Sequence, residues 1–221
     1  MLLETFVKDR AIRSTSTAGE ESIQSIVELL LSEAPKVVAE MCLVVDGSKR
    51  HGDGRFGFVD IFLPPNSASA NTDNIASVLE LKNLHLEGLL KGRAGSWIFK
   101  PPFKEMEDLA ECLDKEVDDD LLARKYMYYS SEKKQPVITT VGEIVEGGLE
   151  QLKRYMETIA KGHVLTYADS GIFDKRVSVR SGTCILAGYV IMVIGGKRVL
   201  WRTAEKITAK YLYNSSDEKW F

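Results

Sequence analysis

The chain has few cysteines and histidines, and those it has are scattered. Its three cysteines, Cys42, Cys112 and Cys184, are widely spaced and odd in number, which favours buried, reduced thiols in an intracellular protein over a disulfide framework. No CxxC pair or Cys/His cluster predicts a zinc site. A lone histidine is more often structural than a ligand, so no role is assigned to any of the three (His51, His85 and His163).

Long apolar runs and a strong excess of one charge are also absent. The longest apolar stretch, Cys184 to Ile194, is too short to span a bilayer, and the first residues lack the apolar segment of a secretory signal. The formal net charge is −3, so no global basic signal indicates nucleic acid, although local patches or a bound metal can supply positive charge. We therefore expect a protein of the cytoplasm or nucleus that does not enter a membrane.

The chain is long enough for one large globular domain. It has 221 residues, of which 44% are hydrophobic, with no internal repeat. Residues 1–18 predict a flexible N-terminal arm, and residues 19–221 a single domain. Residues 84–140 break the regular rhythm and predict a largely helical insertion, with a charged helix over 104–129. Residues 168–182 predict a loop.

Periodic apolar residues predict two amphipathic helices that flank a sheet. In the first, apolar residues recur at spacings of three and four from Gly19 until Pro35, a pattern typical of one helix face. The second helix begins at Val145 and carries a similar stripe as far as Ile159. Five apolar segments predict strands, at 37–45, 55–63, 75–82, 184–194 and 197–202. Short links favour an antiparallel meander for the first three strands and a hairpin for the last two.

Charged residues stand inside two of these apolar strands. Asp60 lies within Gly-Phe-Val-Asp-Ile-Phe-Leu, where an unpaired carboxylate would cost several kcal/mol. In the next strand, period-two alternation puts Val78, Glu80 and Lys82 on one face. If the two strands pair, two carboxylates and one amine can meet there. Such a set suits a hard cation next to a group that can orient a water molecule.

A structural ion pair inside the sheet is the alternative explanation for this charged cluster. Buried ion pairs are often less stable than apolar replacements, and two carboxylates with one amine leave a surplus negative charge that a cation would neutralise. On the second helix, Gln151 and Tyr155 stand four residues apart beside the apolar stripe, so both can reach the same sheet face. Glu20 and Glu21 fall in the first turn of the first helix, where its dipole also favours anions.

Taken in order, these residues resemble the PD-(D/E)xK nuclease superfamily. The match consists of an acidic residue on a first helix, an aspartate in a strand, an E-L-K motif in the next strand and a Q-x-x-x-Y motif on a following helix: Glu20, Asp60, Glu80-Leu81-Lys82 and Gln151 with Tyr155. The most similar branch includes RecB-like nucleases and the nuclease-like domains of fungal proteins and Crinkler-type effectors. Residues 83–97 and 140–144 are similar to the fungal members in particular.

The resemblance covers residues 19–31, 55–83 and 145–200, with one departure: Val59 stands where the motif has proline. It implies an α/β fold with a restriction-endonuclease-like core, in which helices flank a central mixed β-sheet. It also implies a Mg²⁺-dependent phosphodiesterase, with Mn²⁺ able to substitute, that hydrolyses DNA through a metal-activated water.

The resemblance also implies a role for each matching residue. Asp60 and Glu80 would hold the metal through their carboxylates, with the Leu81 carbonyl as a further ligand. Glu20 would act on the metal directly or through water. Lys82 would position or deprotonate the attacking water. The helix would contribute an orienting amide and a phosphate contact, from Gln151 and Tyr155.

Several alternatives stay open from the sequence. The chain could be an inactive nuclease-fold module that binds nucleic acid or protein, or an effector or toxin nuclease domain, and a homodimer or a protein partner fits equally. Arg55 could meet phosphate or lie on the surface, and the acidic run 118–120 could bind a cation or face solvent. Basic and aromatic residues interleave in the insertion, which suits either base stacking or internal packing: Lys91, Arg93, Trp97, Phe99, Lys100, Phe103 and Lys104.

Overall fold

The computed structural model describes residues 20–31, 37–65 and 74–215. The predicted N-terminal arm and the predicted helix stop at Pro35 lie outside the described residues. The chain groups into two compact units. The described residues of the first, here called the sheet unit, are 24–31, 37–65, 74–80, 149–190 and 202–215. Those of the second, here called the helical unit, are 20–23, 81–148 and 191–201, which include the whole predicted insertion.

A mixed sheet of seven strands forms the centre of the fold. Its order is β6-β1-β2-β3-β7-β8, with β9 paired to β7. The pairs β1–β2, β2–β3, β1–β6 and β7–β9 are antiparallel. Strands β3 and β7 run parallel, because the acceptor moves forward along the chain together with the donor. Ile185 N donates to the carbonyl of Asn74, just before β3, and Gly195 N, just after β7, donates to the carbonyl of Leu84, both at 2.8 Å. The strands are β1 Val38–Val44, β2 Phe56–Leu63, β3 Ile75–Leu84, β6 Gly171–Ile172, β7 Val177–Ile194, β8 Arg198–Thr203 and β9 Ile207–Ser215.

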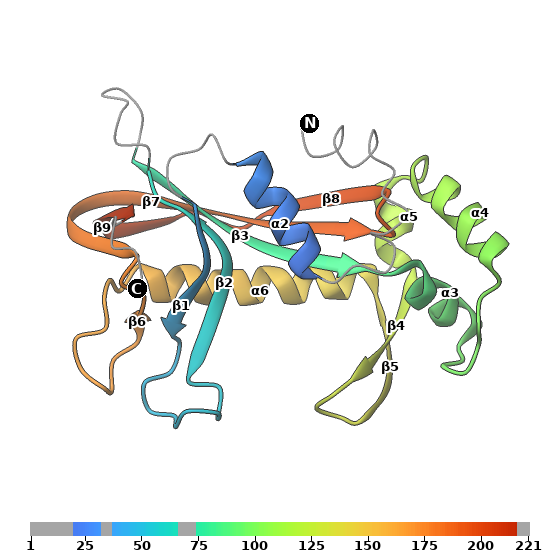
Figure 1. Cartoon of the computed structure of the whole chain (residues 1–221), viewed down its shortest axis with the longest axis horizontal. Helices are drawn as coiled ribbons and strands as arrows, with labels where there is room; N and C mark the ends of the chain where they lie inside the picture. The colour runs from blue at the N-terminus through green and yellow to red at the C-terminus, as the bar shows by residue number, and fades with distance from the viewer. Residues whose placement is uncertain (1–19, 32–36, 66–73, 216–221) are drawn as a thin grey trace. The chain divides into compact units, whose positions relative to one another are not determined.

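Helices flank this sheet, which confirms the predicted α/β class. Helix α2 spans Glu20–Leu30 and helix α6 spans Val141–Ile159. In Figure 1, α2 crosses in front of β3, and α6 passes behind β1 and β2. The predicted meander and the predicted hairpin of β7 with β8 are confirmed as well. In the described residues, no helix combines the length and apolar character needed to cross a bilayer.

Helix α6 begins four residues earlier than predicted, and a capping box explains the difference. The Glu143 backbone N–H donates to Thr140 Oγ1 at 3.1 Å, and the Thr140 backbone N–H donates to Glu143 Oε2 at 2.9 Å. This reciprocal pair satisfies two backbone donors that would otherwise lack a partner at the helix start. The Thr-x-x-Glu spacing was present in the sequence as a local signal for this helix start.

The predicted loop over 168–182 is wrong, because much of it is strand. It contains β6 and the first residues of β7, which pair with β9, a strand that was not predicted. The pairing shifts register between Ser181 and Cys184. Several residues of this part of β7 are exposed, so the segment lacks the apolar alternation that marks a strand in sequence.

The core of the sheet unit lies between α6 and the strands. Tyr213 of β9 closes it, since its hydroxyl donates to the Ile159 carbonyl at 3.0 Å and its ring meets Phe62 edge-on at 5.8 Å. The core residues are Val38, Met41, Leu43, Val59, Phe62, Ala76, Val78, Leu152, Tyr155, Met156, Ile159, Ile172, Val177, Cys184, Leu186, Val190, Ala209 and Tyr213.

Between Leu86 and Thr140, the helical unit forms three helices and a separate β-hairpin. The helices are α3 Leu86–Ala94, α4 Phe103–Leu113 and α5 Asp118–Ala123, and the hairpin pairs β4 Lys125–Ser130 with β5 Gln135–Thr140. The helix predicted over 104–129 is therefore wrong at its end, where tyrosines form a strand. Gly88 and Gly92 allow α3 to pack closely on β4: a Cβ at Gly88 would come within 2.4 Å of the Tyr126 ring.

The structure also shows the state of the cysteines and the surroundings of the acidic run 118–120. All three cysteines are free, but only Cys184 is buried, while Cys42 is half-buried and Cys112 is exposed. Burial raises the pKa of the Cys184 thiol, so it stays protonated near neutral pH. In the acidic run, Asp118 opens α5 and forms a 2.7 Å ion pair with Arg198, and the next two aspartates are exposed to solvent.

Candidate functional site

Asp60 and Glu80 lie on the same face of two adjacent strands. Phe62 of β2 is directly opposite Val78 of β3 in the antiparallel pairing, and directly opposed residues share a face. Continuing this register by two pairs puts Asp60 opposite Glu80, so the two carboxylates share a face. The sequence argument that the two acids meet is thus consistent with the observed register.

Glu80 continues, by alternation from Ala76 and Val78, the face of β3 that packs against α6. Glu80 is only 1% exposed and Asp60 is half-buried. From α6, Gln151 Nε2 donates to the Tyr155 hydroxyl at 3.1 Å. Burial raises the pKa of Tyr155; the hydrogen bond from Gln151 opposes that rise, and the charges of Glu80 and Asp60 add to it. The Tyr155 hydroxyl is therefore within the electrostatic reach of both carboxylates and stays protonated at neutral pH.

A glycine in β2 determines how closely Tyr155 approaches the strand. A Cβ at Gly57 would lie 2.7 Å from Tyr155 Cε1 and 3.1 Å from its hydroxyl oxygen. Real carbon–carbon contacts are about 3.5–4.0 Å, so a side chain at this position would displace the ring. Glycine at position 57 is therefore required for Tyr155 to pack against β2 as observed.

The backbone of β1 is irregular beside Asp60. The pairing of β1 with β2 keeps one register from Ala39↔Ile61 to Met41↔Val59, with Glu40 in between. At this point Glu40 has a φ of 47°, a conformation that is uncommon for a residue other than glycine.

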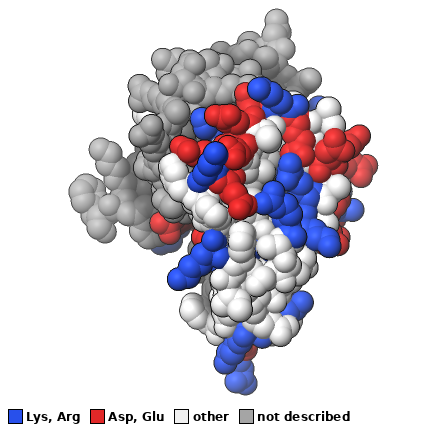
Figure 2. All heavy atoms as spheres, turned by 90° about the vertical axis from the view of Figure 1, so that its right-hand side faces the viewer, with Lys and Arg blue, Asp and Glu red and all other residues white. Residues whose placement is uncertain are grey.

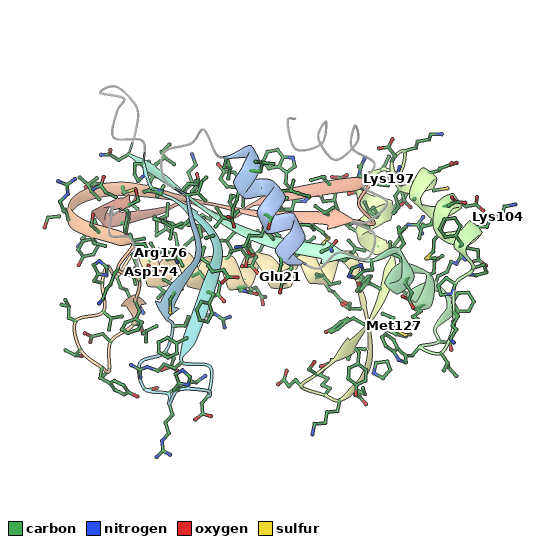
Figure 3. All side chains as sticks on the ribbon, viewed as in Figure 1. Glu21, Lys104, Met127, Asp174, Arg176 and Lys197 are labelled. Atoms are coloured by element: carbon green, nitrogen blue, oxygen red, sulfur yellow. The ribbon has the colours of Figure 1, made fainter. Side chains whose placement is uncertain are left out.

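An ion pair stabilises this irregular segment of β1. Arg176 Nη2 donates to the Ala39 carbonyl at 2.8 Å, to the Glu40 carbonyl at 3.2 Å and to Asp174 Oδ2 at 2.7 Å; Figure 3 labels Asp174 and Arg176 side by side near β1. Burial opposes ionisation of Asp174, but the hydrogen bonds and charge of Arg176 outweigh it and lower the pKa of Asp174. Sequence reasoning missed this pair, because no local pattern links residues 174–176 to residue 40.

The structure places the remaining predicted site residues, Leu81, Lys82 and Glu20, less completely. Leu81 and Lys82 continue strand β3 directly after Glu80 and belong to the helical unit. Alternation puts Lys82 on the same side of the strand as Glu80, and Leu81 on the opposite side. Glu20 is the first residue of α2, and its side chain lies outside what the structure describes. The structure thus relates four of the predicted residues within the sheet unit: Asp60, Glu80, Gln151 and Tyr155.

Arg55 has neither of its predicted roles. It is 3% exposed, and its guanidinium donates to the carbonyls of Gly47 at 2.6 Å, of Lys49 at 3.0 Å, and of Tyr167. The guanidinium also lies 3.8 Å from the centre of the Tyr167 ring. Arg55 therefore connects two loops of the sheet unit from a buried position and is not available to a phosphate.

Asp60 and Glu80 are a pair of carboxylates and not a complete cage of metal ligands. Across the described ranges, no three or more His, Cys, Asp or Glu side chains gather into a group able to hold a metal ion. Mg²⁺ is usually bound by one or two carboxylates, with water and substrate phosphate oxygens as its other ligands. The number and hardness of these two groups fit that ion.

Comparison of the chain with protein-family models, with curated proteins and with solved structures finds no match. The resemblance to the PD-(D/E)xK superfamily therefore depends on the sequence motifs alone. The α/β class with a mixed sheet flanked by helices depends on the structure itself.

Proposed function

We propose that this chain is a metal-dependent phosphodiesterase that hydrolyses DNA. The observation that carries the proposal is the pair Asp60 and Glu80, which share one face of adjacent strands next to the hydrogen-bonded Gln151 and Tyr155. The E-L-K motif adds Lys82, which follows on the same side of β3.

The electrostatics of this face favour a cation. Two carboxylates on one largely buried face carry like charge, which raises the free energy of the doubly ionised state. Burial strengthens this repulsion because less water screens it. A divalent ion held by Asp60 and Glu80 would offset it, with the Leu81 carbonyl as a further oxygen ligand. When bound, such an ion supplies an activated water and neutralises charge that develops on the phosphate.

The other residues have roles that follow from their chemistry. Lys82, in its neutral form, would take a proton from the attacking water; in its charged form it would stabilise the phosphate oxygens. The Tyr155 hydroxyl, kept protonated by its raised pKa, would donate to a phosphate oxygen while Gln151 holds it in place. The water oxygen bonds to phosphorus, the bond from phosphorus to the 3′ oxygen breaks, and that oxygen takes up a proton. The products carry a 5′-phosphate and a 3′-hydroxyl.

Cleavage of plasmid and single-stranded DNA in Mg²⁺, in Mn²⁺ and in EDTA tests the proposal. We expect metal-dependent cleavage that falls at least about 100-fold in Lys82→Ala, the order of magnitude for loss of one proton-transferring group, and falls further in Asp60→Asn. Glu107→Gln is the matched control, since Glu107 is an exposed acid of α4 outside the proposed site. Cleavage by Asp60→Asn at the wild-type rate would reject the mechanism.

Metal binding can be measured without activity. A metal that binds only the folded protein stabilises it by about 2.7 kcal/mol at 100 times its dissociation constant. We expect Mn²⁺ to raise the melting temperature of the wild type and of Glu107→Gln, but not of Asp60→Asn. If Mn²⁺ leaves the wild-type melting temperature unchanged while the chain still binds DNA, the module that binds without cutting is the better description.

A further inference from the structure

The helical unit exposes aromatic and apolar side chains on one surface. Trp97 and Tyr129 are 38% and 50% exposed, and their ring centres are 6.0 Å apart. Ile138 is also 50% exposed, and it lies directly opposite Met127 on the hairpin, one alternation from Tyr129 on the same face. We call Trp97, Tyr129 and Ile138 the aromatic platform. Contiguous exposed apolar surface of this kind marks a binding site more often than chance.

The platform is held rigidly by the structure beneath it. Lys91 Nζ lies 4.1 Å from the centre of the Trp97 ring and forms a 2.8 Å ion pair with Glu87. Glycines on α3 bring that helix into contact with β4, where the backbone carbonyl of Lys125 would lie 2.4 Å from a Cβ at Gly92. A ring held in place loses little further freedom when a ligand stacks on it.

Basic residues outnumber acidic ones in the segments that form the platform. Residues 91–104 contain four basic and no acidic residues, and residues 125–140 contain three basic and one acidic residue. Lys91 and Arg93 pair with Glu87 and Glu105, just outside these ranges, so four net positive charges remain in a chain with a net charge of −3. Figure 2 shows this side of the molecule, with a mainly uncharged surface in its lower part and basic side chains at its lower edge. Five of the basic residues are exposed and form no ion pair with the described residues: Lys100, Lys104, Lys125, Lys133 and Lys134.

We infer that the aromatic platform binds single-stranded nucleic acid, with bases stacked on Trp97 and Tyr129 and phosphates near the surrounding lysines. Exposed rings inside a positive surface are the combination by which proteins grip single strands without reading sequence. A duplex cannot use such rings, because its bases are already stacked inside it. The inference names the substrate class of the proposed nuclease and rests on that proposal only for the link between binding and cleavage.

Fluorescence anisotropy of a labelled 20-nucleotide oligothymidine, titrated with the full chain in EDTA, tests this inference. Stacking of a base on one aromatic side chain contributes about 1–3 kcal/mol of binding free energy. We therefore expect Trp97→Leu and Tyr129→Leu each to weaken binding about tenfold. Trp97→Phe and Tyr129→Phe keep a ring and should stay close to wild type. Phe173→Ala removes a 59% exposed ring of the sheet unit and is the control. Circular dichroism melts verify that each variant is folded.

The lysines are tested by salt dependence. Each lost phosphate contact to a single strand reduces the slope of log affinity against log salt by about 0.7. A double variant, Lys133→Ala with Lys134→Ala, should therefore have a slope smaller by about 1.4 than the wild type. An unchanged slope would show that the hairpin tip does not contact the strand and would overturn this part of the binding mode.

The outcomes separate this inference from the proposed function. Three results would overturn the inference that the platform binds single strands. The leucine variants could bind as tightly as the phenylalanine variants, a matched duplex could bind as tightly as the single strand, or no oligonucleotide could bind at all. If Asp60→Asn abolishes cleavage while the platform variants bind as wild type, the platform is wrong and the nuclease stands. If no condition gives cleavage while the leucine variants lose affinity, the platform stands and the nuclease fails.

Discussion

The substitution Gly57→Ala should test how Tyr155 is positioned beside the two carboxylates. The added methyl group would lie 2.7 Å from Tyr155 Cε1 and 2.7 Å from Val45 Cγ2. Since ordinary carbon contacts are about 3.5–4.0 Å, two side chains must each move by about 1 Å. Tyr155 is 7% exposed and its hydroxyl is bonded to Gln151, so it has little room to move. Overpacking of this kind costs about 1–3 kcal/mol.

A double-mutant cycle assigns that cost to Tyr155. In a Tyr155→Leu background the nearest ring atom is gone, so Gly57→Ala should cost about 1–2 kcal/mol less than in the wild type. Tyr155→Phe is the matched control, because it removes only the hydroxyl and keeps the 2.7 Å contact to Cε1; there Gly57→Ala should cost nearly as much as in the wild type. Urea denaturation gives each free energy of unfolding. An equal cost of Gly57→Ala in all three backgrounds would refute the assigned contact.

Two further predictions concern the residues that support the site. The pKa of Asp174 is lowered in the folded protein, so its carboxylate stabilises the fold above its ordinary value of 3.8, and this contribution is lost as pH falls through the lowered value. Urea titrations should show Asp174→Asn less stable by about 1–3 kcal/mol at pH 7, with a difference that shrinks below about pH 4; a constant difference would contradict the assignment. Arg55→Lys should lower stability by about 1–3 kcal/mol, because one ammonium cannot replace a fork that bonds three carbonyls. Thermal denaturation checks this, with exposed Arg50→Lys as the control, and equal melting temperatures would count against it.

Much of the sheet and both flanking helices could be predicted because their signals are local. Apolar spacing predicted α2 and most of α6, and short links predicted the meander and the final hairpin. The start of α6 also had a local signal, the capping pair Thr140 and Glu143, which apolar spacing alone does not detect.

The elements that were missed carry short or interrupted apolar patterns. The first part of β7, which pairs with β9, has a run of exposed residues at 180–183. The hairpin of β4 and β5 carries exposed aromatic residues such as Tyr128 and Tyr129 in a charged context. The hairpin lacks the apolar alternation of a strand packed on a core, so periodicity could not identify it. Strand β9 does alternate, with Ala209 and Tyr213 in the core and Thr208 and Lys210 exposed, so its signal was present and was overlooked.

For the candidate site, the sequence alone determined only which residues of one strand or one helix lie on the same side. Alternation in β3 puts Glu80 and Lys82 on one side, and a four-residue spacing brings Gln151 to Tyr155. The tertiary structure decided everything that depends on residues distant in the chain. It set the strand register that puts Asp60 on the face of Glu80, and it placed Arg55 under two loops instead of beside a phosphate. Such contacts depend on how separate segments pair and pack, and no local pattern of residues encodes them.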